Sequence, residues 1–186
     1  MDNSVLSEIM QELADSASLI TQGEVDALAD LIEKSGDIFV AGAGRSGFMV
    51  RAFVNRLMHL GFRAHFVGEP TTPAIKSGDL LIIGSGSGET GSLVTMAKKA
   101  AGLNAGVALI TIYPEPTIGQ LGSSIVRLPG TTQKSTLGHG GISTIQPLGS
   151  LFEQLLLLTC ESAVLTIKRR KQMSDQEMFA RHANLE

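Results

Sequence analysis

Hydrophobic residues occur along the chain in two alternating patterns. Short apolar runs rich in β-branched residues predict buried strands at 37–41, 64–67, 80–83, 107–112 and 124–128. Apolar residues three or four positions apart predict helices at 46–60, 90–101 and 147–170, after two leading helices within 5–34 that break near Gly23. Alternating helices and fully apolar strands indicate an α/β fold, a three-layer sandwich with a five-stranded parallel sheet flanked by helices.

The length of 186 residues suits one domain, with leading helices over 1–35 and a C-terminal helix and tail over 147–186. Fifteen Lys and Arg against eighteen Asp and Glu give a net charge of −3, so the sequence predicts no nucleic-acid or membrane partner. No apolar stretch approaches the ~18 residues of a membrane helix. The single cysteine, Cys160, excludes an internal disulfide and a Cys/His zinc cluster, and the N-terminus lacks signal-peptide features. We therefore expect a soluble cytoplasmic protein.

Two glycine-rich loops are candidates for a ligand-binding site, because each follows an apolar strand and opens a helix. The first, Gly42 to Gly47, matches the pattern G-x-G-x-x-G, and the second, Gly84 to Thr90, reads Gly-Ser-Gly-Ser-Gly-Glu-Thr. Strand ends of a parallel sheet meet at one edge, so both loops are expected to face one cleft. Free N–H groups at helix starts bind phosphate without a lysine, and serine and threonine hydroxyls add donors.

Two other interpretations of the loops stay open at this point. They are compatible with tight turns in which Ser and Thr only cap helices. They are also compatible with dinucleotide binding, since Glu69 follows the first loop by about 20 residues. A dinucleotide fingerprint leaves the second loop unexplained, and the Gly-Lys-Ser/Thr ending of a P-loop is missing.

The paired loops resemble the sugar isomerase (SIS) domain, with its flavodoxin-like fold, whose members bind phosphosugars. More closely, the chain resembles the 6-phospho-3-hexuloisomerase family over nearly its whole length. The motifs that carry this resemblance are Arg45-Ser46-Gly47, Arg56 to Gly61, Val67-Gly68-Glu69, Ser85 to Thr90, Leu151 to Gln154 and Arg181 to Glu186. The segment Gln133 to Thr144 matches no pattern of the family.

The resemblance implies interconversion of 3-hexulose 6-phosphate and fructose 6-phosphate through an enediol, in the ribulose monophosphate pathway of formaldehyde assimilation, without cofactor or metal. It further implies a homotetramer with active sites near subunit contacts. Glu153 and His182 are implied as catalytic residues, His182 through a tail that docks over a neighbouring subunit's cleft. The implied substrate-binding residues are Gly44, Arg45, Ser46, Ser85, Gly86, Ser87 and Thr90. A non-catalytic phosphosugar-binding module, or a SIS isomerase acting on arabinose 5-phosphate, are the alternatives.

The residues alone leave several assignments open. Glu153 lies on an apolar helix face, which makes a carboxylate a stronger base, but Glu161 is an equal candidate by periodicity. Glu89 suits the first turn of a helix and His59 the last turn of one, where a cation is favoured. The remaining assignments are His65 as a strand residue, His139 as a possible ligand contact, Lys168 to Lys171 as last-turn cations, and Cys160 as a packed hydrophobe. The long helix is apolar beyond one stripe, which favours a partner subunit.

Overall fold

A single parallel sheet forms the centre of the computed structural model, which describes residues 4–113, 115–131 and 142–185. Its strand order is β2-β1-β3-β4-β5, the flavodoxin-like order. The strands are β1 (Ile38–Gly42), β2 (Ala64–Phe66), β3 (Leu80–Gly84), β4 (Gly106–Thr111) and β5 (Ser124–Arg127). The predicted five-stranded parallel sheet is therefore confirmed, with each strand bound within one residue of its prediction.

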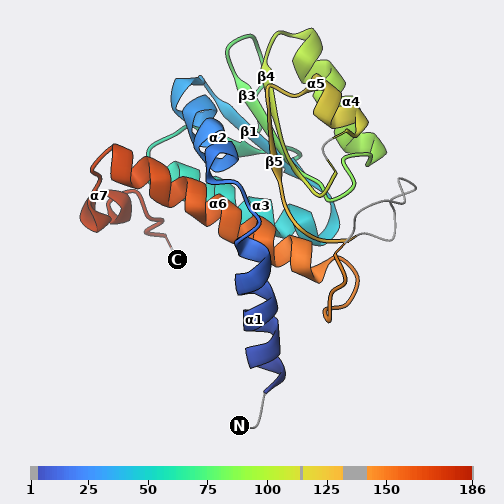
Figure 1. Cartoon of the computed structure of the whole chain (residues 1–186). Helices are drawn as coiled ribbons and strands as arrows, with labels where there is room; N and C mark the ends of the chain where they lie inside the picture. The colour runs from blue at the N-terminus through green and yellow to red at the C-terminus, as the bar shows by residue number, and fades with distance from the viewer. Residues whose placement is uncertain (1–3, 114, 132–141, 186) are drawn as a thin grey trace.

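Helices cover both faces of the sheet and complete the three-layer sandwich (Figure 1). One face packs against α2 (Gln22–Lys34), α3 (Gly44–His59) and α6 (Ser150–Arg170), and α1 (Val5–Ala17) contacts α6. The other packs against α4 (Gly91–Gly102) and α5 (Thr117–Leu121), and α7 (Asp175–Phe179) follows α6. Burial on both faces explains why the strands are apolar throughout, as in β3, where all five residues are buried.

The two glycine loops leave the sheet side by side. Strand β1 has β2 on one side and β3 on the other, so the chain reverses its direction of travel across the sheet between them. Gly42 at the end of β1 is paired in register with Gly84 at the end of β3. This is the topological switch point at which open α/β sheets bind ligands.

The two leading helices are confirmed, but the break between them lies at 18–21, a few residues before Gly23. Helix α1 ends at Ala17 and α2 begins at Gln22, so Gly23 lies within the first turn of α2. The chain leaves the helix at Ser18, whose hydroxyl donates to the carbonyl of Asp15 at 2.6 Å. Serine and threonine compete for backbone hydrogen bonds and so favour helix ends, whereas one glycine in a first turn is tolerated.

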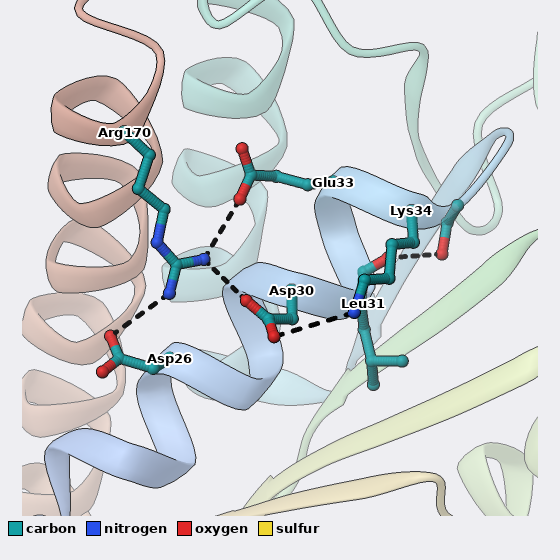
Figure 2. A network of polar contacts seen from close by, with 7 residues as sticks. Asp26, Asp30, Leu31, Glu33, Lys34 and Arg170 are labelled. Carbon is teal, nitrogen blue, oxygen red and sulfur yellow. Dashed lines mark hydrogen bonds and ion pairs between the residues drawn. The ribbon is translucent and has the colours of Figure 1, made fainter.

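Helix α6 is joined to α2 by Arg170, as Figure 2 shows. Its guanidinium donates to Asp30 at 2.7 Å and to Glu33 at 3.1 Å, and Asp26 lies 3.8 Å away. Lys168 pairs with Asp175 at the start of α7. The prediction that this basic run ends a helix is confirmed, and part of it is engaged within the chain.

The expectation that no apolar stretch approaches the length of a membrane helix is wrong for α6, which is long and apolar enough to span a membrane, but half of its most apolar window is buried inside the fold. It packs against α2 and α3, so it is a core helix. Cys160 lies on its inner face at 1% exposure, as expected, and burial raises the pKa of its thiol. On its outer face Leu158 and Leu165 remain 50% and 44% exposed.

Candidate active site

A cleft of about 360 Å³ opens at the carboxyl ends of β1 and β3. The two glycine loops form one side of it and the start of α6 forms another. Its lining comprises Ala43, Gly44, Arg45, Ser46, Gly84, Ser85, Gly86, Ser87, Thr90, Leu93, Ile112, Thr131, Leu148, Gly149, Phe152 and Glu153. All seven residues expected to bind substrate and one of the two expected catalytic residues therefore line one cavity.

The glycines of the first loop allow a helix to start directly against the end of a strand. A Cβ atom on Gly47 would lie 2.8 Å from the carbonyl oxygen of Gly42, closer than real Cβ contacts come. Gly44 has φ +56°, in the left-handed region that favours glycine. The G-x-G-x-x-G pattern is thus explained by close packing of α3 on β1. Glu69, the acidic residue of the dinucleotide-binding interpretation, accepts a hydrogen bond from Arg51 at 2.9 Å.

The second loop is braced by its own hydroxyls. Ser85 is 4% exposed, and its Oγ accepts a hydrogen bond from the N–H of Gly88 at 3.1 Å. The Oγ of Ser87 accepts from the N–H of Glu89 at 3.3 Å. Because both hydroxyls accept in these bonds, each keeps its own proton to donate to a ligand. Within the described part of the chain, the hydroxyls of Ser46 and Thr90 have no hydrogen-bond partner.

Three helix N-termini meet at this cleft without side-chain caps. The N-cap residues of α3, α4 and α6 are Ala43, Thr90 and Gly149, and none of them makes a side-chain cap bond. The interpretation of the loops as Ser/Thr caps is therefore wrong for α3 and α4. Free N–H groups and the positive ends of three helix dipoles favour an anion in the cleft.

Glu153 reaches the cleft from the first turn of α6. Its side chain is 14% exposed, and Oε2 accepts from Nε of Arg45 at 2.5 Å. Arg45 is 63% exposed, so the pair joins a largely buried carboxylate to a solvent-exposed guanidinium, and both residues line the cleft. The apolar side chains of Phe152, Ile112 and Leu93 line the same cavity. Among the described residues that line the cleft, Glu153 carries the one carboxylate, and it shares the cleft with the uncapped helix starts.

Glu161, which periodicity makes an equal candidate, lies elsewhere. It pairs with Arg56 at 3.2 Å, is 43% exposed, and lines a separate groove beside Leu158 and Leu165. Helix α6 turns the two carboxylates toward different surroundings, so only Glu153 is available to a ligand in the cleft.

His182 lies at the opposite end of α3 from the cleft in its own chain. Its ring stacks on His59 with centroids 5.2 Å apart and on Phe179 at 5.8 Å. Arg181 fixes this tail by donating to the carbonyls of His59 and Glu177. His59 is separated from Ser46 by about 20 Å of helix. A role for His182 in catalysis therefore requires the cleft of another subunit.

His59 differs from the helix-ending cation that the sequence predicts. It is 4% exposed, and burial lowers the pKa of its imidazole, with His182 and Arg56 lowering it further. The buried ring is therefore favoured in its neutral form.

Acidification is expected to weaken this end of the fold. The folded-state pKa of His59 lies below its ordinary value near 6.5, so the unfolded chain takes up the proton first as the pH falls. The stability contributed by neutral His59 is complete above about pH 6.5 and is lost as the pH falls through the folded-state pKa. Melting temperatures between pH 7.5 and 5 should fall less steeply in His59→Gln than in the original protein. Parallel curves would contradict this role.

The remaining sequence assignments have different outcomes. His65 lies on the edge strand β2 and contacts Asp37 at 3.2 Å, as a strand residue should. Glu89 does not serve α4 as expected, because its carboxylate accepts from the N–H and hydroxyl of Thr117 and so caps α5. His139 lies outside the described residues. Sequence reasoning missed Thr131 and Leu148, which no motif marks.

The fold and the cleft are those of a SIS domain, and the chain belongs to the SIS domain family, whose profile matches residues 31–158. Among its relatives, the 3-hexulose-6-phosphate isomerase of Bacillus subtilis is 50% identical over 97% of both chains. The 3-hexulose-6-phosphate isomerase of Mycobacterium gastri is 40% identical and matches 97% of this chain and 89% of that protein.

Solved structures agree with the fold. One is the crystal structure of a Methanococcus jannaschii protein, from which a function as 3-hexulose-6-phosphate isomerase was inferred. It has a TM-score of 0.83 at 33% identity and covers 97% of this chain and 98% of that one. The sugar isomerase domain of a Sphaerobacter thermophilus transcription factor has a TM-score of 0.73 at 14% identity, covering 95% of this chain and 93% of that one, and supports the fold alone.

Proposed function

We propose that this chain interconverts 3-hexulose 6-phosphate and fructose 6-phosphate, the isomerase step of the ribulose monophosphate pathway. The observation that carries the proposal is a carboxylate, Glu153, in a cleft of anion-binding loops, within a chain half identical to a 3-hexulose-6-phosphate isomerase over nearly its whole length. The substrate phosphate would bind Ser46, Ser85, Gly86, Ser87 and Thr90, close to the starts of α3 and α4.

The reaction needs one proton moved between adjacent carbons. Glu153 takes the proton from C2, next to the C3 carbonyl, and electrons shift to give an enediol across C2 and C3. O3 gains a proton as the enediol forms. In the second half of the reaction the proton returns from Glu153 to C3, while O2 loses its proton and becomes the new C2 carbonyl. Such a base contributes about 10²- to 10⁴-fold to the rate. Arg45, which pairs with Glu153, would stabilise negative charge on O2 and O3 during the reaction.

A coupled assay tests the proposal. Ribulose 5-phosphate, formaldehyde and a hexulose-phosphate synthase generate the substrate, and the chain should convert it to fructose 6-phosphate without nicotinamide. The alternative, a phosphosugar-binding module without activity, predicts binding of fructose 6-phosphate but no turnover. A SIS isomerase of other specificity predicts turnover of arabinose 5-phosphate instead.

Removing the hydroxyls of the second loop should weaken substrate binding. A hydrogen bond to a charged phosphate contributes about 1.5–3 kcal/mol, so Ser85→Ala/Ser87→Ala should raise KM at least about tenfold. Ser92→Ala, an exposed serine on α4 outside the cleft, is the matched control and should leave KM unchanged. An unaltered KM in the double variant would argue against phosphate binding by this loop.

We also propose a cytoplasmic homotetramer whose clefts lie near subunit contacts. In support, Leu158 and Leu165 leave an apolar strip on α6, and α1 projects from the body in Figure 1 with Leu6 and Met10 exposed. A neighbouring subunit would supply His182 to each cleft, since the tail does not reach the cleft of its own chain.

Mixed oligomers test the shared site. Glu153→Gln and His182→Ala should each lower activity strongly when assayed alone. When the two are unfolded together and reassembled, a cleft with Glu153 from one chain can receive His182 from the other, so part of the activity should return. No recovery above the sum of the separate variants would contradict a site shared between subunits.

A further inference from the structure

A series of hydrogen bonds that runs through the buried side chain of Gln146 joins α1 to the start of α6. Gln154 on α6 donates from Nε2 to Oε1 of Gln146 at 2.5 Å, and Gln146 donates from its own Nε2 to Oε2 of Glu12 at 2.9 Å. The backbone N–H of Ile145 donates to the other oxygen of Glu12, also at 2.9 Å. Gln146 is 6% exposed and its bonds to Glu12 and Gln154 are partly buried, whereas the bond from Ile145 to Glu12 is exposed.

The direction of these hydrogen bonds is fixed by chemistry. An amide has a donor end and an acceptor end, whereas an ionised carboxylate only accepts. Glu12 therefore terminates the chain, and Gln146 and Gln154 are oriented toward it. Burial raises the pKa of Glu12, but hydrogen bonds from Gln146, Ile145 and Thr144 outweigh it and hold the pKa below its ordinary value. This agrees with an ionised acceptor.

The residues that follow Gln146 form a strained turn at the cleft. Leu148 has φ +54° although it is not a glycine, and its side chain is 67% exposed. Asn104 and Gln172 also have positive φ, but both follow the ends of helices, where this conformation is common. A left-handed non-glycine residue costs about 1–3 kcal/mol and persists where its surroundings hold it. The bonds of Gln146, two residues earlier, supply such a hold.

The turn leads directly into the first turn of α6, which carries Glu153. Ser150 donates its N–H to the carbonyl of Pro147 at 3.1 Å, and Glu153 donates its own to Gly149 at 3.0 Å. Leu148, Gly149 and Glu153 all line the cleft. A shift of Gln146 would therefore move the free N-terminus of α6 and the carboxylate together.

We propose that Gln146 is a positioning residue for the isomerase site, fixing the start of α6 and hence Glu153 through its bonds to Glu12 and Gln154. This inference rests on the proposed function. It also makes α1, a helix that projects from the body, part of the support of the cleft (Figure 1). A misplacement of about 1 Å in a catalytic group can cost about 10²-fold in rate.

The test reverses the polarity of the network in the full chain. Gln146→Glu places a second carboxylate against Glu12 and removes the donated bond. Adding Glu12→Gln restores a donor, because the new amide at position 12 can donate to the new carboxylate at position 146 while still accepting from Ile145, and Gln154 keeps its bond. We expect kcat to fall at least about tenfold in Gln146→Glu with KM changed less than about threefold, and to return to within about threefold of the original in the double variant.

Amide hydrogen exchange of residues 148–153 provides the readout that does not depend on activity. It should accelerate in Gln146→Glu and recover in the double variant. The inference is overturned if Gln146→Glu keeps its kcat, if the double variant recovers its melting temperature but not its kcat, or if exchange does not change. If the original protein has no isomerase activity, the proposed function fails, and the exchange measurement still decides whether Gln146 positions α6.

Discussion

Replacing Glu153 by Gln is expected to lower kcat by about 10²- to 10⁴-fold while leaving the affinity for fructose 6-phosphate nearly unchanged. An amide retains the size of the carboxylate but cannot accept the proton from carbon. The phosphate, by contrast, would be held by the two loops and the starts of α3 and α4, on other elements than Glu153. Steady-state kinetics with an independent binding measurement separates the two effects.

Glu161→Gln is the matched control, because it makes the same chemical change on the same helix and also breaks a pair with an arginine, Arg56. It should leave kcat within about twofold of the original, since Glu161 lies outside the cleft. Equal losses of kcat and affinity in Glu153→Gln would contradict its role as the base. So would an equally large effect of Glu161→Gln.

Gly47→Ala should damage both the fold and ligand binding. An alanine in a helix normally gains about 0.5–1 kcal/mol over glycine. Here the new Cβ would lie 2.8 Å from the backbone oxygen of Gly42, and no side-chain rotation can relieve that contact. We expect a net loss of about 2 kcal/mol in the free energy of unfolding, and weaker binding of fructose 6-phosphate because α3 must move away from β1.

Gly102→Ala provides the comparison, because a Cβ at the last residue of α4 would meet nothing within 4 Å. It should be neutral or stabilising by up to about 1 kcal/mol. Denaturant unfolding of both variants tests the assignment. Similar stabilities for the two variants would mean that the close approach of α3 to β1 is not needed.

The sheet and its two loops could be predicted because their signals are local. Apolar runs such as Leu80 to Ile83 define buried strands, and glycines at strand ends define the turns. The break between α1 and α2 was misplaced because Gly23 is the more conspicuous residue, whereas the capping chemistry of Ser18 decides where α1 ends. The short helices α5 and α7 have too few residues for a periodic pattern.

The site could be predicted only in part, because much of it depends on contacts between distant segments. Glu153 and Glu161 have similar neighbours along their helix, and only the packing of α6 on α3 and the sheet separates them. The bond between Gln146 and Glu12 spans 134 positions in sequence, and no motif marks it. His182 shows the converse, since its motif predicts a role that its position within one chain does not provide.

A crystal structure with bound fructose 6-phosphate tests the central claim most directly. The phosphate should lie among the hydroxyls of Ser85, Ser87 and Thr90 at the start of α4. C2 and C3 of the sugar should lie about 3–3.5 Å from the Glu153 carboxylate, which is the distance for proton transfer. A phosphate bound outside this cleft, for example in a separate cavity lined by Thr21, Tyr113 and Arg127, would contradict the central claim.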